Sequence, residues 1–130
     1  MRILLADDQT EIRSALRLWL DQNDGLSVVA ESADAADLLS AAAATQAQLV
    51  LLDWELPGVG AAGTGGEAAG LLSRLQQASP GVKVVAMSGR PEARKEAIHA
   101  GADAFVSKCE PPEALLSLLS ELAAGDGCGD

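Results

Sequence analysis

Three aspartates are the residues of this sequence whose placement points most clearly to chemistry. Asp7 and Asp8 directly follow the apolar run 3–6, and Asp53 directly follows the apolar run 49–52. Short runs of this kind are typical of strands buried on both faces of a parallel sheet. Carboxylates crowded at one crevice repel one another and favour a bound cation. Mg²⁺ fits because it prefers oxygen ligands and commonly takes one or two carboxylates; the alternative is that Asp7 and Asp8 cap the following helix.

Asp53 could also act as a nucleophile. An aspartate carboxylate can attack a phosphoryl group and form an aspartyl-phosphate; the alternative is that Asp53 is only a third metal ligand. Phosphoryl transfer requires positioning and neutralisation of charge on the phosphoryl oxygens. Two other polar residues at the ends of apolar runs can contribute. Ser88, which carries a hydroxyl, directly follows one run, and Lys108, which carries an ammonium group, comes after Ser107 at the end of another. The set predicts a phosphoryl-transfer site with Asp53, Lys108 and Ser88 as its catalytic residues.

The apolar pattern predicts five successive strand–helix units that would bring these residues together. Strands are expected at about 3–6, 26–30, 49–53, 82–87 and 102–106, and helices at about 12–20, 34–45, 66–78, 91–99 and 112–124. Such alternation predicts an α/β fold, a single doubly wound five-stranded parallel sheet with helices on both faces. The flavodoxin-like strand order 2-1-3-4-5 is common at this size. One domain is therefore expected over residues 1–124, with residues 125–130 as a tail or the start of a linker.

Composition narrows the possible partners and the compartment. The chain has 130 residues, a formal net charge of −10 and 48% hydrophobic residues, which favours one packed domain and disfavours direct binding of nucleic acid. No apolar run approaches the roughly 18 residues that span a bilayer. Cys109 and Cys128 are the only cysteines and His99 is the only histidine, so no zinc site is expected. A reduced, cytoplasmic protein is the natural interpretation.

The motif set resembles the receiver domain of two-component response regulators over residues 1 to about 124. The matching residues are Asp7-Asp8, Asp53 with Pro57-Gly58 behind it, Ser88-Gly89, and the run 101–108 that ends in Lys108. The resemblance implies phosphorelay signalling, in which Asp53 accepts a phosphoryl group from a phosphohistidine on a sensor histidine kinase. The protein would then be a conformational switch that catalyses its own phosphorylation and dephosphorylation, and not a metabolic enzyme.

The same resemblance implies roles for the residues around Asp53. Mg²⁺ would be held by Asp7 or Asp8, by Asp53 and by the main-chain carbonyl of Glu55. Lys108 would bridge the acids and then the phosphate. Ser88 would move toward the phosphate, and Phe105 would be the aromatic residue that switches with it. The alternative for Phe105 is an ordinary core residue.

The C-terminal part of the sequence bears on the partners. The segment 108–126 looks like that of receivers attached to C-terminal helix-turn-helix domains. A DNA-binding domain outside this chain and a homodimer formed on phosphorylation are therefore expected. The sequence departs from the family pattern in the Gly/Ala-rich loop 57–66, which carries roughly four extra residues. It also has Lys108-Cys109 where many receivers have a cis Lys-Pro bond, and a trans bond is expected here.

Three residues are expected to tune the site. Glu55 and Arg90 each lie two residues beyond a strand-end site residue, so their opposite charges could form a partial lid over the pocket. Trp54 follows Asp53, and strand alternation points its indole to the opposite side, where it should report movement of the loop. The charged residues of segment 92–96 are expected to form a solvated helix face with local ion pairs.

Other functions fit less well. The run Gly58 to Gly63 matches G-x-G-x-x-G, but it does not join a strand directly to a helix as a dinucleotide site requires. Asp53-Trp54-Glu55 is similar to the D-x-D motif of aspartate-nucleophile phosphatases, which place that motif after the first strand. A degenerate receiver used only for docking is the third alternative, and the complete acid cluster disfavours it.

Overall fold

A five-stranded parallel sheet forms the centre of the structure. The computed structural model describes residues 1–23, 25–56, 66–108 and 112–127. The strands are β1 (Arg2–Ala6), β2 (Ser27–Ser32), β3 (Leu49–Asp53), β4 (Lys83–Ser88) and β5 (Ala104–Ser107). They pair in the order β2-β1-β3-β4-β5, and every neighbouring pair is parallel. The predicted flavodoxin-like order is confirmed.

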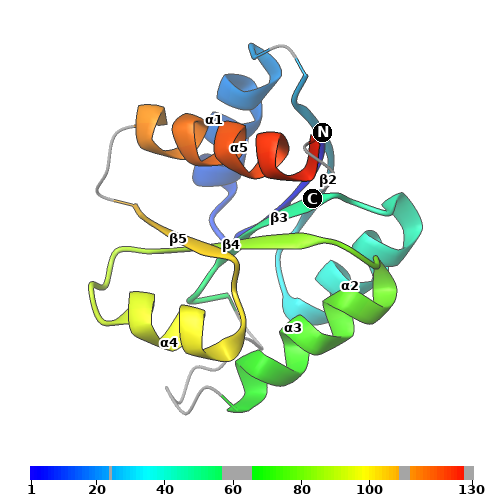
Figure 1. Ribbon diagram of the computed structural model, residues 1–130, viewed down its shortest axis with the longest axis vertical. Helices are drawn as coiled ribbons and strands as arrows, with labels where there is room; N and C mark the ends of the chain where they lie inside the picture. Colours follow the sequence, from blue (N-terminus) through cyan, green and yellow to red (C-terminus); the bar gives the residue numbers. More distant parts are fainter. Residues whose placement is uncertain (24, 57–65, 109–111, 128–130) are drawn as a thin grey trace.

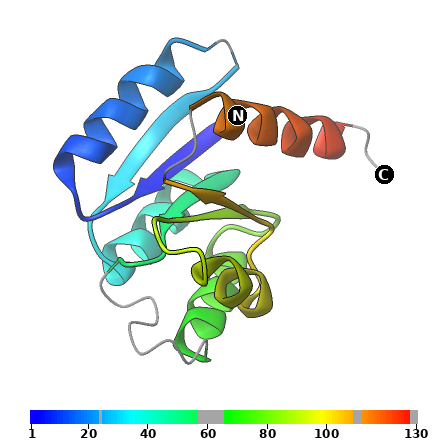
Figure 2. The same cartoon turned by 90° about the vertical axis from the view of Figure 1, so that its left-hand side faces the viewer.

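Five helices connect the strands and cover both faces of the sheet. They are α1 (Thr10–Asp21), α2 (Ala35–Thr45), α3 (Gly66–Ala78), α4 (Ala93–Ala100) and α5 (Pro112–Gly127). Helices α1 and α5 lie on one face, and α2, α3 and α4 lie on the other (Figures 1 and 2). Helix α5 continues past residue 124 into the segment expected to be a tail or linker.

Strand alternation divides the core into two clusters. Leu4, Val50 and Leu52 point toward the side of α2, α3 and α4, where they pack with residues such as Leu75. Their neighbours Ile3, Leu5, Leu49 and Leu51 point the other way and pack with Leu20, Leu115 and Leu119 of α1 and α5. Successive side chains of a strand point to opposite faces, so continuous apolar runs are what a sheet covered on both sides requires. β3 is buried at all five positions and is the central strand.

The boundaries of the last two units differ slightly from the sequence expectation. β5 begins at Ala104. At Asp103 the main-chain amide still donates to the Val84 carbonyl at 2.9 Å, but the Val84 amide donates to the Asp103 carboxylate at 2.7 Å and not to a main-chain carbonyl. α4 begins at Ala93 and ends at Ala100, where an end near residue 99 was expected. Gly101 caps it with a φ of 117°, a left-handed conformation that glycine favours.

Several expectations lie outside the described residues. The loop 57–65, which contains the G-x-G-x-x-G match, and the Lys108–Cys109 bond are among them. Within the described ranges, no helix is both long and apolar enough to cross a membrane.

Candidate functional site

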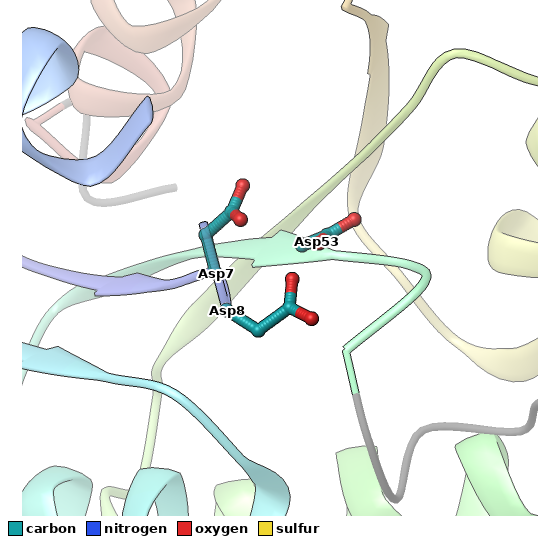
Figure 3. A group of neighbouring side chains, drawn as sticks. All are labelled: Asp7, Asp8 and Asp53. Atoms are coloured by element: carbon teal, nitrogen blue, oxygen red, sulfur yellow. The ribbon is translucent and has the colours of Figure 1, made fainter. Parts of the chain in front are cut away.

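The three aspartates meet where β1 and β3 end (Figure 3). Each of Asp7, Asp8 and Asp53 offers a carboxylate oxygen, and these atoms lie within 4.8 Å of one another. Asp7 and Asp53 are each 3% exposed, whereas Asp8 is exposed. They come together because β1 and β3 are adjacent and parallel, so their carboxyl ends lie at the same edge of the sheet.

Lys108 supplies a positive charge to this cluster. Its Nζ lies 3.2 Å from Asp7 Oδ2 and 3.2 Å from Asp53 Oδ1. Its main-chain amide donates to the Ser88 carbonyl at 3.0 Å, which continues the pairing of β4 and β5 and fixes where the side chain starts. Burial by itself would lower the pKa of Lys108, but the charges of Asp53 and Asp7 outweigh it and raise the pKa. Lys108 is therefore held as an ammonium ion.

The surroundings of Asp53 raise the pKa of its carboxyl group. Burial raises its pKa, and the negative charge of Asp7 adds to this effect. The Glu55 amide, which donates to Asp53 Oδ1 at 3.1 Å, and the Lys108 ammonium act in the opposite direction without cancelling it. The ionised Asp53 is thus incompletely compensated, as expected of a carboxylate that awaits a further cation.

Arg13 is a contributor that the sequence did not single out. It projects from α1 at a position off the apolar stripe of that helix. Its guanidinium donates through Nη1 to the Asp7 carbonyl and through Nε to Glu31 Oε1 at 3.1 Å. Arg17 also binds Glu31, at 2.7 Å, but has no described contact with the loop after β1. Donation from Arg17, joined by that from Arg13, lowers the pKa of Glu31 and keeps it charged.

Ser88 lies at the end of β4 and is fully buried. Its hydroxyl donates to the Glu55 carboxylate, at 2.9 Å from Oε1, and its Oγ accepts from the Arg90 amide at 3.0 Å. Arg90 in turn binds Glu55, with Nη2 3.0 Å from Oε2. The structure therefore brings Glu55 and Arg90 together beside Ser88.

Trp54 and Phe105 both lie in the core cluster on the side of α4. Trp54 is 4% exposed, and its Nε1 donates to Glu96 Oε1 at 3.2 Å. Phe105 is buried, with only 7% of its surface exposed, and the Arg94 guanidinium lies 5.0 Å from its ring centroid. Glu96 thus bonds a buried indole, whereas the charged residues of segment 92–96 were expected to form a solvated helix face. No sequence signal identified it, because the contact joins residues 42 positions apart.

Sequence comparisons agree with this geometry. The model of the family described as response regulator receiver domain matches residues 3–120. The probable transcriptional regulatory protein SgaR of Hyphomicrobium methylovorum is 28% identical over 127 residues, which cover 96% of this chain and 57% of that protein. The nitrate/nitrite response regulator protein NarL of Escherichia coli K12 is 29% identical over 126 residues, which cover 95% of this chain and 55% of that protein. The chain therefore spans little more than half the length of these relatives.

Solved structures show the same fold. A two-component response regulator of the LuxR family from Aurantimonas sp. SI85-9A1 superposes with a TM-score of 0.81 at 26% identity, over 95% of this chain and 85% of that one. The signal receiver domain of the putative response regulator NarL from Mycobacterium tuberculosis superposes with a TM-score of 0.79 at 22% identity, over 95% and 96% of the two chains. From the family match, the strand order and the acid cluster together, the chain belongs to the response regulator receiver domains, the phosphorelay modules of two-component systems.

Proposed function

We propose that Asp53 is the phosphoryl acceptor of this receiver domain. The observation that supports this most strongly is that the carboxylates of Asp7, Asp8 and Asp53 share one edge of the sheet with Lys108, which contacts two of them. The Asp53 carboxylate would attack the phosphorus of a phosphohistidine on a sensor histidine kinase. The P–N bond breaks, the imidazole leaves, and an acyl phosphate remains on Asp53.

Dephosphorylation, the other half of the cycle, uses water as the nucleophile. Water attacks the phosphorus, the bond between phosphorus and the Asp53 oxygen breaks, and inorganic phosphate leaves. The catalysis is therefore confined to self-phosphorylation and self-dephosphorylation, as expected of a regulator rather than of a metabolic enzyme.

The contacts of Asp53 suggest which of its two carboxylate oxygens attacks the phosphorus. Within the part of the chain that the structure describes, both the Lys108 ammonium and the Glu55 amide contact Oδ1. We therefore assign the attack to Oδ2. Lys108 would then move its contact to a phosphoryl oxygen, and Ser88 would donate its hydroxyl hydrogen to another, so that two donors stabilise the developing charge.

Mg²⁺ is the cofactor that this donor set fits best. The cluster presents three carboxylates to one ammonium group, and an oxygen-only set suits a hard divalent cation. Asp7, Asp8 and Asp53 would hold the ion together with the main-chain carbonyl of Glu55, whose peptide already lies against Asp53 through its amide. Bound there, Mg²⁺ supplies neutralisation of charge on the phosphoryl oxygens.

Glu55 and Arg90 are the residues we assign to the lifetime of the phosphoryl group. Their ion pair has an N–O distance of 3.0 Å, and both side chains are less than half exposed. The pair lies directly beside Ser88, so it can restrict the approach of water to the phosphorus. Trp54, which separates Asp53 from Glu55, is the natural reporter of movement there.

The partners follow from the family and from charge. A sensor histidine kinase would supply the phosphoryl group, and Phe105 would take part in the switch that Ser88 starts. A C-terminal DNA-binding domain is proposed by likeness to transcriptional regulatory proteins such as SgaR, of which this chain spans 57%. Homodimer formation on phosphorylation is proposed from membership of the receiver family. The chain has a net charge of −10, of which Asp126 and Asp130 contribute two, so this domain itself, proposed to end near residue 124, is strongly acidic and would repel nucleic acid.

Two alternatives are not favoured. An aspartate-nucleophile phosphatase does not agree with membership of the receiver family. A degenerate receiver that only docks would have no need of the acid cluster and of Lys108, yet the three carboxylates lie together and Lys108 contacts two of them.

Mass spectrometry tests the proposal directly. The protein is incubated with acetyl phosphate and Mg²⁺, and its intact mass is compared with that of a sample in excess EDTA. We expect one phosphoryl group in Mg²⁺, none in EDTA, and peptide mapping to Asp53. Phosphate on another residue, or none in a protein shown by titration to bind Mg²⁺, would contradict the assignment.

A further inference from the structure

The loop after Asp53 is joined to α4 at two points. Trp54 Nε1 donates to Glu96 Oε1 at 3.2 Å. Arg90 forms the second connection, because its Nη2 lies 3.0 Å from Glu55 Oε2 and 3.5 Å from the same Glu96 Oε1. One carboxylate oxygen of α4 therefore contacts the indole directly and Glu55 through a guanidinium.

The burial of these groups indicates which connection is stronger. The Trp54 side chain is buried, and a buried indole N–H is costly to leave without an acceptor. Glu96 is 26% exposed, so its contact with the indole is partly shielded from water. Arg90 and Glu55 are more exposed, and an exposed ion pair alone contributes little stability. The importance of the Arg90 bridge lies in where it holds Glu55.

Glu55 and a phosphoryl group would compete for Ser88. A serine hydroxyl has one hydrogen to donate, and that hydrogen is directed to the Glu55 carboxylate at 2.9 Å. In the proposed phosphorylated state the same hydrogen is donated to a phosphoryl oxygen. The contact with Glu55 must therefore break before Ser88 can act, and anything that holds Glu55 in place opposes that step.

We infer that Glu96 is a positioning residue that holds Ser88 in its unphosphorylated arrangement, an inference that rests on the proposed function. Glu96 acts through Arg90, which fixes Glu55 beside Ser88, and through Trp54, which fixes the segment between Asp53 and Glu55. Because linkage is reciprocal, a ligand that engages Glu96 on α4 would favour phosphorylation, and phosphorylation would favour that ligand.

Glu92, which directly precedes helix α4, is a matched control for Glu96. Glu92 also approaches Arg90, with 3.4 Å to Nη1, but it makes no described contact with Trp54. Glu92→Gln and Glu96→Gln remove the same charge near the same guanidinium. Glu96→Gln keeps an oxygen that can accept from the indole, and Glu96→Ala removes both connections.

Beryllofluoride affinity in Mg²⁺ measures the competition without phosphoryl turnover, because beryllofluoride stands in for the phosphoryl group on Asp53. We expect Glu96→Ala to tighten binding roughly 5-fold or more, Glu96→Gln to have a smaller effect, and Glu92→Gln to remain within about twofold of wild type. The acetyl phosphate reaction should accelerate in the same order. A Glu96→Ala protein with wild-type affinity would overturn the inference. A Glu92→Gln protein whose affinity is tightened as much as that expected for Glu96→Ala would also overturn it.

A double-mutant cycle separates positioning from a general structural effect. Glu55→Ala removes the group that competes for Ser88, so Glu96→Ala should lose most of its effect in that background. Equal effects of Glu96→Ala with and without Glu55 would overturn the inference and leave the proposed function intact. A wild-type protein that binds Mg²⁺ but neither beryllofluoride nor phosphate would overturn both.

Discussion

The two ends of the same parallel strands use polar residues in different ways. At the amino end, side chains pair with the main chain: Arg2 donates to the Gln46 carbonyl at 2.9 Å, Ser79 to the Ala47 carbonyl at 2.7 Å, and Asp103 accepts from the Val84 amide at 2.7 Å. These contacts satisfy carbonyls and amides where helices and strands begin or end. Their role is structural.

At the carboxyl end the side chains instead face one another. Asp7, Asp8 and Asp53 share a small space, and Lys108 is the cation that contacts two of them. Three carboxylates and one ammonium leave a net negative charge at this end, and the repulsion lowers the stability of the fold unless a cation binds. The comparison teaches that a strand-end aspartate is functional when it is gathered with other acids around a lysine, as Asp53 is, and structural when it bonds a main-chain amide of the neighbouring strand, as Asp103 does.

The largest expected difference comes from the same substitution made at each end. Asp53→Asn should abolish phosphorylation by acetyl phosphate while the fold persists, because an amide is nearly isosteric but cannot attack phosphorus. Asp103→Asn should be phosphorylated at the wild-type rate but lose about 0.5–1.5 kcal/mol of unfolding free energy, since its bond to the Val84 amide loses charge assistance. Intact mass and urea denaturation measure the two effects. A phosphorylated Asp53→Asn protein would move the acceptor elsewhere.

A cation substitution gives the next largest contrast. Lys108→Ala should slow phosphorylation roughly 100-fold, because one preorganised donor to the transition state is lost. Mg²⁺ binding should persist, since the three carboxylates remain. Arg2→Ala, at the amino end, should leave the phosphorylation rate unchanged. Rates from intact mass and Mg²⁺ titrations followed by tryptophan emission measure this, and a Lys108→Ala protein with the wild-type rate would remove Lys108 from the mechanism.

Sequence alone predicted much of this fold for simple physical reasons. Apolar runs that end at polar residues mark strands of a covered parallel sheet, and the strand order then brings residues from remote parts of the chain to one edge. Asp7, Asp53 and Lys108 come together in this way, although they are far apart in sequence. Asp34, expected to begin the second helix, does accept from the Asp37 amide at 2.8 Å.

The residues that escaped prediction depend on how helices dock. Arg13 and Glu96 both lie off the apolar positions of their helices, and the pattern alone assigns such residues to solvent. Arg13 contacts the segment after β1, and Glu96 contacts the segment after β3. Both contacts therefore depend on how the helix packs against the sheet, which the apolar pattern does not specify. The start of β5 also differs from the prediction, and there the Val84 amide of β4 donates to the Asp103 carboxylate and not to a main-chain carbonyl.

The Arg13 contact predicts a third, smaller effect at the carboxyl end. Arg13→Gln removes the guanidinium that holds the Asp7 carbonyl, so Mg²⁺ affinity should weaken roughly 10-fold, as is typical for groups that orient metal ligands. Arg17→Gln removes the other partner of Glu31 without touching that carbonyl and should bind Mg²⁺ as wild type does. Tryptophan emission titrations provide both constants. Equal weakening in the two variants would mean that charge on Glu31, and not the contact with Asp7, sets the affinity.

The smallest expected effect is the pH dependence of stability in EDTA. Burial and the charge of Asp7 raise the pKa of Asp53 in the folded state, so the folded protein holds this proton more tightly than the unfolded chain does. The contribution of Asp53 to the unfolding free energy therefore falls as pH rises from about 4 through its folded-state pKa, and stays low at neutral pH. Asp53→Asn has no such proton to lose, and comparison of the two proteins at each pH removes the titration of groups they share.

The melting temperatures of the two proteins should therefore diverge as pH rises. At pH 7 in EDTA, Asp53→Asn should melt about 2–5 °C above wild type, and the difference should vanish near pH 4. Mg²⁺ should reverse the order by stabilising wild type more, because it binds the native carboxylates. A wild-type protein that is the more stable one at pH 7 in EDTA would mean that attraction to Lys108 outweighs burial and Asp7. The carboxyl end would then already be compensated without a metal, and the contrast with the amino end would lose its physical basis.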